Sequence, residues 1–190
     1  SDSQGGIYAP QGLDIPSIQQ HKESTRQLKA VYCEGSVCSV VDHGILSNED
    51  LLTLDVDILI PAALENQITE VNAAKIQAKY IFEVANGPIT SAGDQILDEK
   101  GILVFPDILV NAGGVTVSYF EWVQNRSGLY WSEAEVFSQL KQRMVKATES
   151  IWQVAQQQGI SLRTAGYVLA LERIGEAISA KGTRDYYVRR

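Results

Sequence analysis

An asparagine and two adjacent glycines lie where an apolar segment gives way to a helical pattern. The sequence Asn111-Ala112-Gly113-Gly114 follows the apolar residues 102–105, and a helix is expected to begin at about Val115. Glycines at the start of a helix let the backbone approach a ligand, and free N–H groups there favour polar or anionic groups. Val115, Ser118 and Trp122 recur at helical spacing and share one face. The Ser118 hydroxyl is therefore a candidate contact for a small polar substrate, although a core helix with one satisfied serine has the same spacing.

Two further loops carry small residues at the expected ends of strands. Pro61-Ala62-Ala63 follows one apolar run and Ala85-Asn86-Gly87-Pro88 follows the next. Ligands of open parallel sheets bind beyond the carboxyl ends of the strands, and small residues leave room there for a flat ligand. The amides of Asn86 and Asn111 can both donate and accept hydrogen bonds, as a nicotinamide carboxamide requires of its partners. The three loops together predict a nicotinamide cofactor site, whereas an Asn-Gly pair alone is also a common turn.

Three short apolar runs alternate with helical patterns. The runs at residues 57–61, 80–84 and 102–105 are nearly continuous, which suits strands covered on both faces. Ile68, Val71 and Ile76 mark an expected helix between the first two runs, and Ile96-Leu97 mark another before the third. A further helix is expected within residues 13–30, with Pro16 in its first turn. This alternation predicts an α/β fold, a Rossmann-like parallel sheet with flanking helices.

The C-terminal third is expected to be helical. Residues 132–135 have the form of a capping box, with Trp131 and Val136 placed as a hydrophobic staple. Apolar residues then follow at steps of three and four up to Gly159, the expected C′ residue: Val136, Leu140, Met144, Ala147, Ile151 and Val154. A last helix is expected to begin at Ser161 and to bury one apolar side: Ala165, Val168, Leu169, Ile174 and Ile178.

The usual phosphate-binding element of a dinucleotide fold is absent from the sequence, because no G-x-G-x-x-G occurs. The opening Ser1-Asp2-Ser3 resembles the end of the second strand of such a fold, where an acid commonly binds the adenosine ribose. Asp2 is therefore a candidate cofactor contact. We expect the sheet to be N-terminally incomplete and the chain to be a fragment, or one whose earlier part was removed.

The composition indicates a soluble, cytoplasmic domain and argues against several partners. The net charge is −7 and no basic stripe occurs, so no nucleic acid is expected as a partner. No apolar run approaches the ~20 residues that span a membrane, and no signal peptide is visible, so no membrane partner is expected either. Cys33 and Cys38 lack a neighbouring histidine or a second cysteine pair. We interpret them as reduced packing residues and expect no metal site; His21 and His43 are interpreted as structural or exposed.

Three longer motifs resemble the cofactor-binding domain of glutamate dehydrogenase. They are LDVDILIPAALENQIT at residues 54–69, ANGP at 85–88 and NAGGVTVSYFEW at 111–122. The similarity runs from the opening SDSQGGIY to the helix near Arg163, whereas the sister leucine, phenylalanine and valine dehydrogenases do not usually carry the first motif in this form. The resemblance implies an incomplete dinucleotide-binding domain over residues 1–130. Residues 131–190 would be a helical segment that packs on it or bridges to a substrate domain.

The resemblance also implies how a cofactor would be held. By motif match, Asn86 and Asn111 would contact the nicotinamide ribose and carboxamide, and Ala62 and Ala63 would lie against the cofactor ribose. Asp2 would lie near the adenosine ribose. Its charge would repel a 2′-phosphate and favour NAD, yet the Ser-Asp-Ser opening resembles family members that use NADP, so the cofactor is NAD or NADP.

The implied reaction is the reversible oxidative deamination of L-glutamate to 2-oxoglutarate and ammonia. By motif match, Ser118 would hydrogen-bond the distal carboxylate of glutamate and Val115 would pack on its methylenes. The catalytic lysine and aspartate of such enzymes come from a preceding substrate domain, so no catalytic residue is expected in this chain and the chain is expected to be inactive alone. The family is usually hexameric, so a homo-oligomer is expected.

Two alternatives stay open at this point. One is a sister amino-acid dehydrogenase with a different pocket, in which an apolar residue in place of Ser118 would suit leucine or phenylalanine. The other is a non-catalytic nucleotide-binding or interaction module, which applies if 190 residues are the complete protein.

Overall fold

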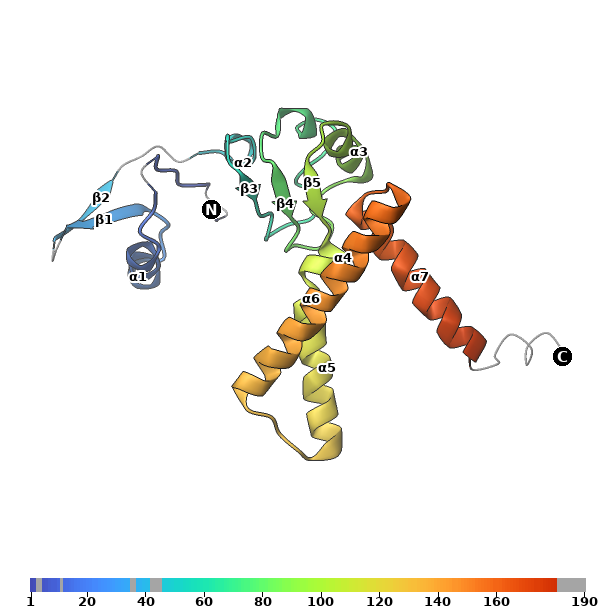
Figure 1. The fold of residues 1–190 in the computed structure, drawn as a ribbon. Coiled ribbons are helices and arrows are strands. Elements are labelled where there is room, and N and C mark those ends of the chain that lie inside the picture. Colours follow the sequence, from blue (N-terminus) through green and yellow to red (C-terminus); the bar gives the residue numbers. More distant parts are fainter. Residues whose placement is uncertain (3–4, 11, 35–36, 42–45, 181–190) are drawn as a thin grey trace. The chain divides into compact units, whose positions relative to one another are not determined.

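The computed structural model describes residues 1–2, 5–10, 12–34, 37–41 and 46–180 (Figure 1). His43 lies outside these residues, and the side chains of Cys33 and Cys38 lie outside the described part as well. The chain forms two compact units, Ser1–Asp55 with Lys75–Gln77 and Val56–Ala74 with Ala78–Arg190. The expected division between residues 130 and 131 stays a prediction.

The first unit contains the helix expected within residues 13–30 and a hairpin that the sequence did not predict. Helix α1 (Ile15–Thr25) begins after Asp14, whose carboxylate accepts a hydrogen bond from the Ser17 N–H at 3.3 Å, with proline in its first turn. An antiparallel hairpin and a short helix follow: β1 (Ala30–Glu34), β2 (Val37–Val41) and α2 (Asn48–Leu52). This unit also holds Asp2.

The second unit is built on the predicted parallel sheet. Its strands lie in the order β3 (Ile58–Leu59), β4 (Tyr80–Phe82) and β5 (Leu103–Phe105), and both pairs are parallel. Helix α3 (Ser91–Glu99) connects β4 to β5 and packs against β5, as the apolar pair Ile96-Leu97 predicted. The α/β fold with a parallel sheet and flanking helices is therefore confirmed.

The strands are covered less completely than expected. Ile81 and Leu97 are fully buried, but Ile58 is 51% exposed and Tyr80 is also exposed. Side chains alternate across a strand, so one face of this short sheet packs on the core while the other is more open. The expectation of strands covered on both faces is therefore wrong for these described residues.

The helix expected around Ile68, Val71 and Ile76 is also wrong, because the connection from β3 to β4 holds only a single 3₁₀ turn, η1 (Ala73–Lys75). The Asn72 side chain accepts a hydrogen bond from the Thr69 N–H at 2.8 Å and donates one to the Gln67 carbonyl at 2.9 Å. A side chain that bonds nearby backbone in this way competes with helix formation.

The two glycines after Asn111 lie inside a helix rather than before it. A short helix, α4 (Asp107–Val110), follows β5 directly, and α5 (Ala112–Ser127) begins immediately after Asn111. Gly113 and Gly114 therefore form the first turn of α5, and neither has a positive φ. The expected start at Val115 lies three residues after the observed one. Glycine has a weak helix propensity, so Gly113 and Gly114 do not indicate a helical turn in the sequence, although α4 and the rest of α5 hold this turn in place.

The last two helices confirm most of the C-terminal prediction. Helix α6 (Glu133–Gln158) opens with the capping box of Ser132 and Glu135 and ends at Gly159 in the left-handed region. Its predicted apolar stripe is buried or half-buried throughout, and in Figure 1 α6 runs alongside α5. Helix α7 (Leu162–Ala180) then packs against α6 and β5.

The core of this helical part surrounds Leu109, with Ile151, Ala155, Leu162 and Ala165 buried against it. The predicted buried side of α7 holds only for its first half, because Ile174 and Ile178 are exposed. None of the helices in the described residues is long and apolar enough to cross a membrane.

Candidate functional site

The structure brings Asn86 and Asn111 into direct contact at the carboxyl end of the sheet. Asn86 follows β4, and Asn111 lies one helical turn beyond β5, where α4 meets α5. The Asn111 Nδ2 donates a hydrogen bond to the Asn86 Oδ1 at 2.6 Å. Asn86 is exposed and Asn111 is half-buried, so the amide pair (Asn86 and Asn111) is accessible to a ligand.

The loops after β3 and β4 are tied to each other by backbone hydrogen bonds. The Pro61 carbonyl accepts from the Val84 and Ala85 N–H groups at 3.1 and 3.0 Å. Farther along, the Asn66 N–H donates to the Gly87 carbonyl at 2.9 Å. Ala62 and Ala63 are exposed between these two ties, at the same end of the sheet as the amide pair. Backbone hydrogen bonds therefore join the two loops along one edge of the sheet.

The other predicted site residues lie on α5 and in the first unit. Val115, Ser118 and Trp122 are all exposed on α5, and Val115 is 69% exposed. Asp2 belongs to the first unit, where its Oδ2 lies 3.4 Å from the Lys22 Nζ of α1. The charge of Asp2 is thus partly balanced within its own unit.

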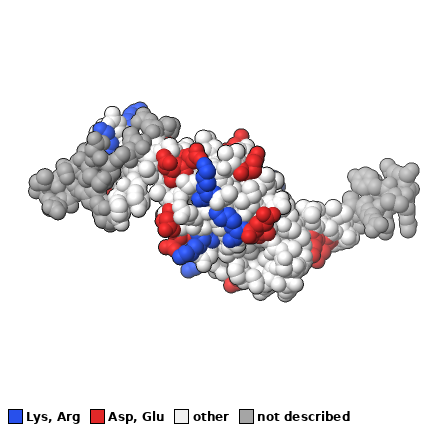
Figure 2. All heavy atoms as spheres, turned by 90° about the horizontal axis from the view of Figure 1, so that it is seen from above, with Lys and Arg blue, Asp and Glu red and all other residues white. Residues whose placement is uncertain are grey.

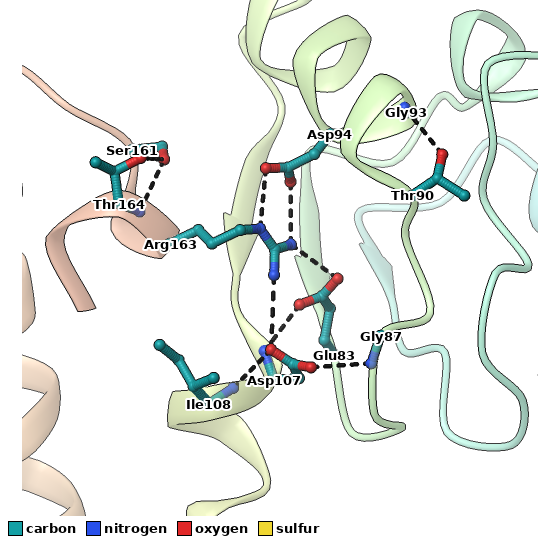
Figure 3. Close-up of polar contacts among 10 residues, drawn as sticks. All are labelled: Glu83, Gly87, Thr90, Gly93, Asp94, Asp107, Ile108, Ser161, Arg163 and Thr164. Carbon is teal, nitrogen blue, oxygen red and sulfur yellow. Dashed lines mark hydrogen bonds and ion pairs between the residues drawn. The ribbon is translucent and has the colours of Figure 1, made fainter. Parts of the chain in front are cut away.

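Arg163, in the first turn of α7, contacts three carboxylates from separate elements (Figure 3). Its Nε and Nη2 donate to the two oxygens of Asp94 at 2.9 and 3.0 Å, and Nη2 also donates to the Glu83 Oε1 at 2.9 Å. Its Nη1 lies 3.6 Å from the Asp107 Oδ1. Glu83 follows β4, Asp94 belongs to α3 and Asp107 begins α4, so one guanidinium joins three elements. We call these four residues the Arg163 cluster.

Helices α7 and α4 make a close contact near Arg163. Helix α7 approaches α4 at Gly166, where an added Cβ would lie only 2.8 Å from the Ile108 Cδ1. Arg163 lies three residues before Gly166 on α7, and Asp107 directly precedes Ile108 on α4. Gly166 therefore lets α7 and α4 lie close together near Arg163 and Asp107.

Burial governs the electrostatics of the Arg163 cluster. The Glu83 side chain is 0% exposed and that of Arg163 is 21% exposed. Burial raises the pKa of the Glu83 carboxyl above its ordinary value, and the hydrogen bonds and charge of Arg163 offset only part of that shift. Burial also works against the Arg163 charge, yet hydrogen bonds to Asp94 and Glu83 raise the pKa of the guanidinium overall. These contacts thus favour the charged form of Arg163, whereas burial works against the charged form of Glu83.

The sequence did not single out this cluster as functional. The one available signal was Glu83, a carboxylate inside the apolar run of residues 80–84. A charged residue in a buried strand requires a partner. That partner comes from α7, and spacing along the chain gives no indication of it.

Charged side chains of both signs are mixed on the face of the molecule that Figure 2 draws. On this face, basic and acidic side chains interleave and form no patch of one sign. In the second unit, for example, Lys79 and Asp57 pair at 2.6 Å. Within the described residues, no group of three or more histidine, cysteine, aspartate or glutamate side chains is placed to hold a metal ion.

Comparison with known proteins identifies relatives over nearly the whole chain. The family model described as Glutamate/Leucine/Phenylalanine/Valine dehydrogenase matches residues 1–182. The NADP-specific glutamate dehydrogenase of Synechocystis sp. is 60% identical over 98% of this chain. The cryptic catabolic NAD-specific glutamate dehydrogenase GudB of Bacillus subtilis is 46% identical over 96% of it. The chain covers 44% and 40% of these two relatives, and so spans less than half of their length.

Solved structures agree with the sequence relatives. The hetero-hexameric glutamate dehydrogenase of Thermus thermophilus matches with a TM-score of 0.81 at 32% identity, over 94% of this chain and 40% of that one. The glutamate dehydrogenase of Peptoniphilus asaccharolyticus gives a TM-score of 0.72 at 37% identity, over 93% and 37%. Because the family model matches residues 1–182 and both structures match the fold, this chain belongs to the glutamate/leucine/phenylalanine/valine dehydrogenase family.

Proposed function

We propose that this chain forms part of the cofactor domain of an enzyme that oxidatively deaminates L-glutamate to 2-oxoglutarate and ammonia, reversibly, with NAD or NADP. The observation that carries the proposal is the amide pair, in which Asn86 and Asn111 meet at the carboxyl end of a parallel sheet. The names of the 60% and 46% identical relatives support the substrate. Because this chain spans less than half of each, the activity is proposed for the protein that contains it.

The amide pair fits a primary carboxamide. Its internal hydrogen bond uses one N–H of Asn111 and the oxygen of Asn86. Within the described residues, the Asn86 Nδ2 and the Asn111 Oδ1 have no protein partner, so the pair keeps one donor group and one acceptor for a ligand. A nicotinamide carboxamide presents the complementary acceptor and donor. When bound, the nicotinamide ring would supply the hydride acceptor, and the pair would fix the orientation of the ring.

Three further residues are proposed to contact the rest of such a cofactor. Ala62 and Ala63 leave the adjacent edge of the sheet without bulky side chains, where we propose the cofactor ribose lies. We propose that Asp2 contacts the adenosine ribose. Because Lys22 lies 3.4 Å from the Asp2 carboxylate, the local charge is not purely negative, and a 2′-phosphate is not repelled by Asp2 alone. The arrangement therefore suits both NAD and NADP.

Val115 and Ser118 are the proposed substrate contacts. Both are exposed on α5, which begins at the amide pair. A serine hydroxyl can donate to the distal carboxylate of glutamate, while the valine side chain can pack on the methylenes. We also propose that the protein works as a homo-oligomer.

A hybrid enzyme tests the proposal directly. Residues 1–190 would replace the matching part of the Synechocystis relative, and the hybrid would be assayed with glutamate, leucine, phenylalanine, valine and tryptophan, each with NAD and NADP. We expect glutamate to have the highest kcat/KM. A folded hybrid that prefers another amino acid would support a sister dehydrogenase. One that binds cofactor but turns over no amino acid would support a non-catalytic nucleotide-binding module.

Asn111→Ala in this hybrid is expected to raise the KM for the cofactor and to lower kcat. A carboxamide left without its partner costs about 1–3 kcal/mol, which corresponds to a combined loss of about tenfold to a hundredfold. Steady-state kinetics with varied cofactor measure the effect. The matched control is Asn125→Ala, which removes an exposed amide from the far end of the same helix. Equal cofactor KM and kcat values in the two variants would mean that Asn111 does not contact the cofactor and serves only as the residue that precedes α5.

A further inference from the structure

A continuous series of contacts leads from the Arg163 cluster to the amide pair. Arg163 pairs with Asp107, and the other oxygen of Asp107 accepts a hydrogen bond from the Gly87 N–H at 2.9 Å (Figure 3). Gly87 follows Asn86 directly. The Asp107 backbone carbonyl also accepts a hydrogen bond from the Asn111 N–H at 3.0 Å. Asp107 therefore bonds Asn111 directly and also bonds Gly87, the residue that follows Asn86.

Asp107 is fixed in turn by its own surroundings. Its N–H donates to the buried Glu83 Oε2 at 2.8 Å, and its Oδ1 accepts from the Ile108 N–H at 2.8 Å. Its side chain is 18% exposed, and a carboxylate in such a position needs a positive charge nearby. Arg163 is the cation that the structure places there, and its planar fork is held by two hydrogen bonds to Asp94.

We propose that Arg163 is a positioning residue for the amide pair. By orienting the carboxylate of Asp107, it fixes the loop of residues 85–88 against α4 and so sets the spacing of Asn86 and Asn111. This inference rests on the proposed function in one respect, namely that the pair binds the carboxamide of a nicotinamide. Arg163 itself touches neither cofactor nor substrate in this scheme, and it acts through Asp107 and Gly87.

The first test asks whether Arg163 positions the pair, and it needs no activity. Nitrogen-15 NMR spectra of the 190-residue chain would follow the side-chain NH₂ signals of Asn86 and Asn111 in Arg163→Lys and Asp107→Ala. Lysine keeps the charge but cannot make the two-pronged contact, and alanine removes the acceptor for Gly87. The matched control is Ser132→Ala, which breaks the capping box of α6, lowers the melting temperature and touches no part of the cluster.

We expect both cluster variants to move the two side-chain signals and the control to leave them in place. Unmoved signals in Arg163→Lys, with the fold intact, would overturn the inference. If Arg163→Lys does not fold, Asp107→Asn decides, because an asparagine keeps an acceptor for Gly87 but loses the ion pair with Arg163. It is expected to move the signals in the same direction.

The second test asks whether this positioning matters for the cofactor. In the hybrid enzyme, Arg163→Lys is expected to raise the cofactor KM about tenfold, as for the loss of one charge-assisted hydrogen bond, and to leave the KM for glutamate nearly unchanged. A purely structural role would lower the melting temperature, as we expect Ser132→Ala to do, without this split between the two KM values. If the NMR signals shift but the cofactor KM is unchanged, the proposal that Arg163 positions the amide pair stands. The proposal that the amide pair binds the nicotinamide carboxamide would then be contradicted.

Discussion

Replacing Arg163 with leucine is expected to lower the free energy of unfolding by about 3–5 kcal/mol at neutral pH, because it leaves a buried carboxylate without its partner. Glu83 is 0% exposed and loses its cation, and Asp94 loses both hydrogen bonds from the guanidinium. Urea unfolding of the chain, followed by circular dichroism, measures the loss. A second variant, Glu83→Gln combined with Arg163→Leu, is expected to recover part of it, since an amide needs no counter-charge.

The pH dependence of this loss has a definite sign. Burial raises the folded-state pKa of Glu83 above its ordinary value of 4.5, and removal of the Arg163 charge raises it further. A raised carboxyl pKa contributes stability that is fully present below the unfolded-state pKa and is lost as the pH rises through the folded-state value. The difference between Arg163→Leu and the parent chain should therefore shrink as the pH falls toward 4.5. A difference that stays constant with pH, or grows on acidification, would mean that Glu83 is not the group left unpaired.

Ser118→Val is expected to change substrate selection rather than general activity. If Ser118 donates its hydroxyl proton to the distal carboxylate of glutamate, its loss costs about 1.5–3 kcal/mol, or about tenfold to a hundredfold in kcat/KM for glutamate. Norvaline has no such carboxylate, so its kcat/KM should fall much less or rise in the more apolar pocket. The measurement is kcat/KM for both substrates in the hybrid enzyme.

The two substrates provide an internal control for this variant. A misfolded or cofactor-poor protein loses both activities alike, and Ser138→Val on the exposed face of α6 should change neither. Parallel losses for glutamate and norvaline in Ser118→Val would remove Ser118 from the substrate pocket and leave it an ordinary surface serine.

The elements that sequence predicted well are those whose signals are local. The capping box at Ser132 and the apolar stripe of α6 depend on residues within one helix, and both are confirmed. The three parallel strands follow from continuous apolar runs. The region between β3 and β4 misleads because its apolar residues have helical spacing while Asn72 bonds the nearby backbone in a turn. The predicted start of α5 was wrong because two adjacent glycines are more typical of a loop than of the first turn of a helix.

The candidate site also has a part that could be predicted from sequence and a part that could not. Asn86 and Asn111 could be paired from sequence because both follow strands of one parallel sheet, and such ends share an edge. Their contact at 2.6 Å confirms that placement, while their role toward a cofactor stays a prediction. The Arg163 cluster that supports them was not predictable, since Arg163 lies on α7, far along the chain from Glu83, Asp94 and Asp107. The spacing of the apolar residues shows that α7 has an apolar side, but it does not show against which strand that side packs.

The pairing of Glu83 with Arg163 also sets an order of events as the chain folds. The two residues are 80 positions apart, and contacts between such distant residues form late because the intervening chain must first be ordered. Until α7 has been synthesised and has docked, the Glu83 carboxylate has no cation beside it and favours water over the sheet. We therefore expect docking of α7 to be a late step, after which Glu83 is buried with its cation beside it. Weakening this late contact shortens the lifetime of the folded state more than it slows the initial collapse.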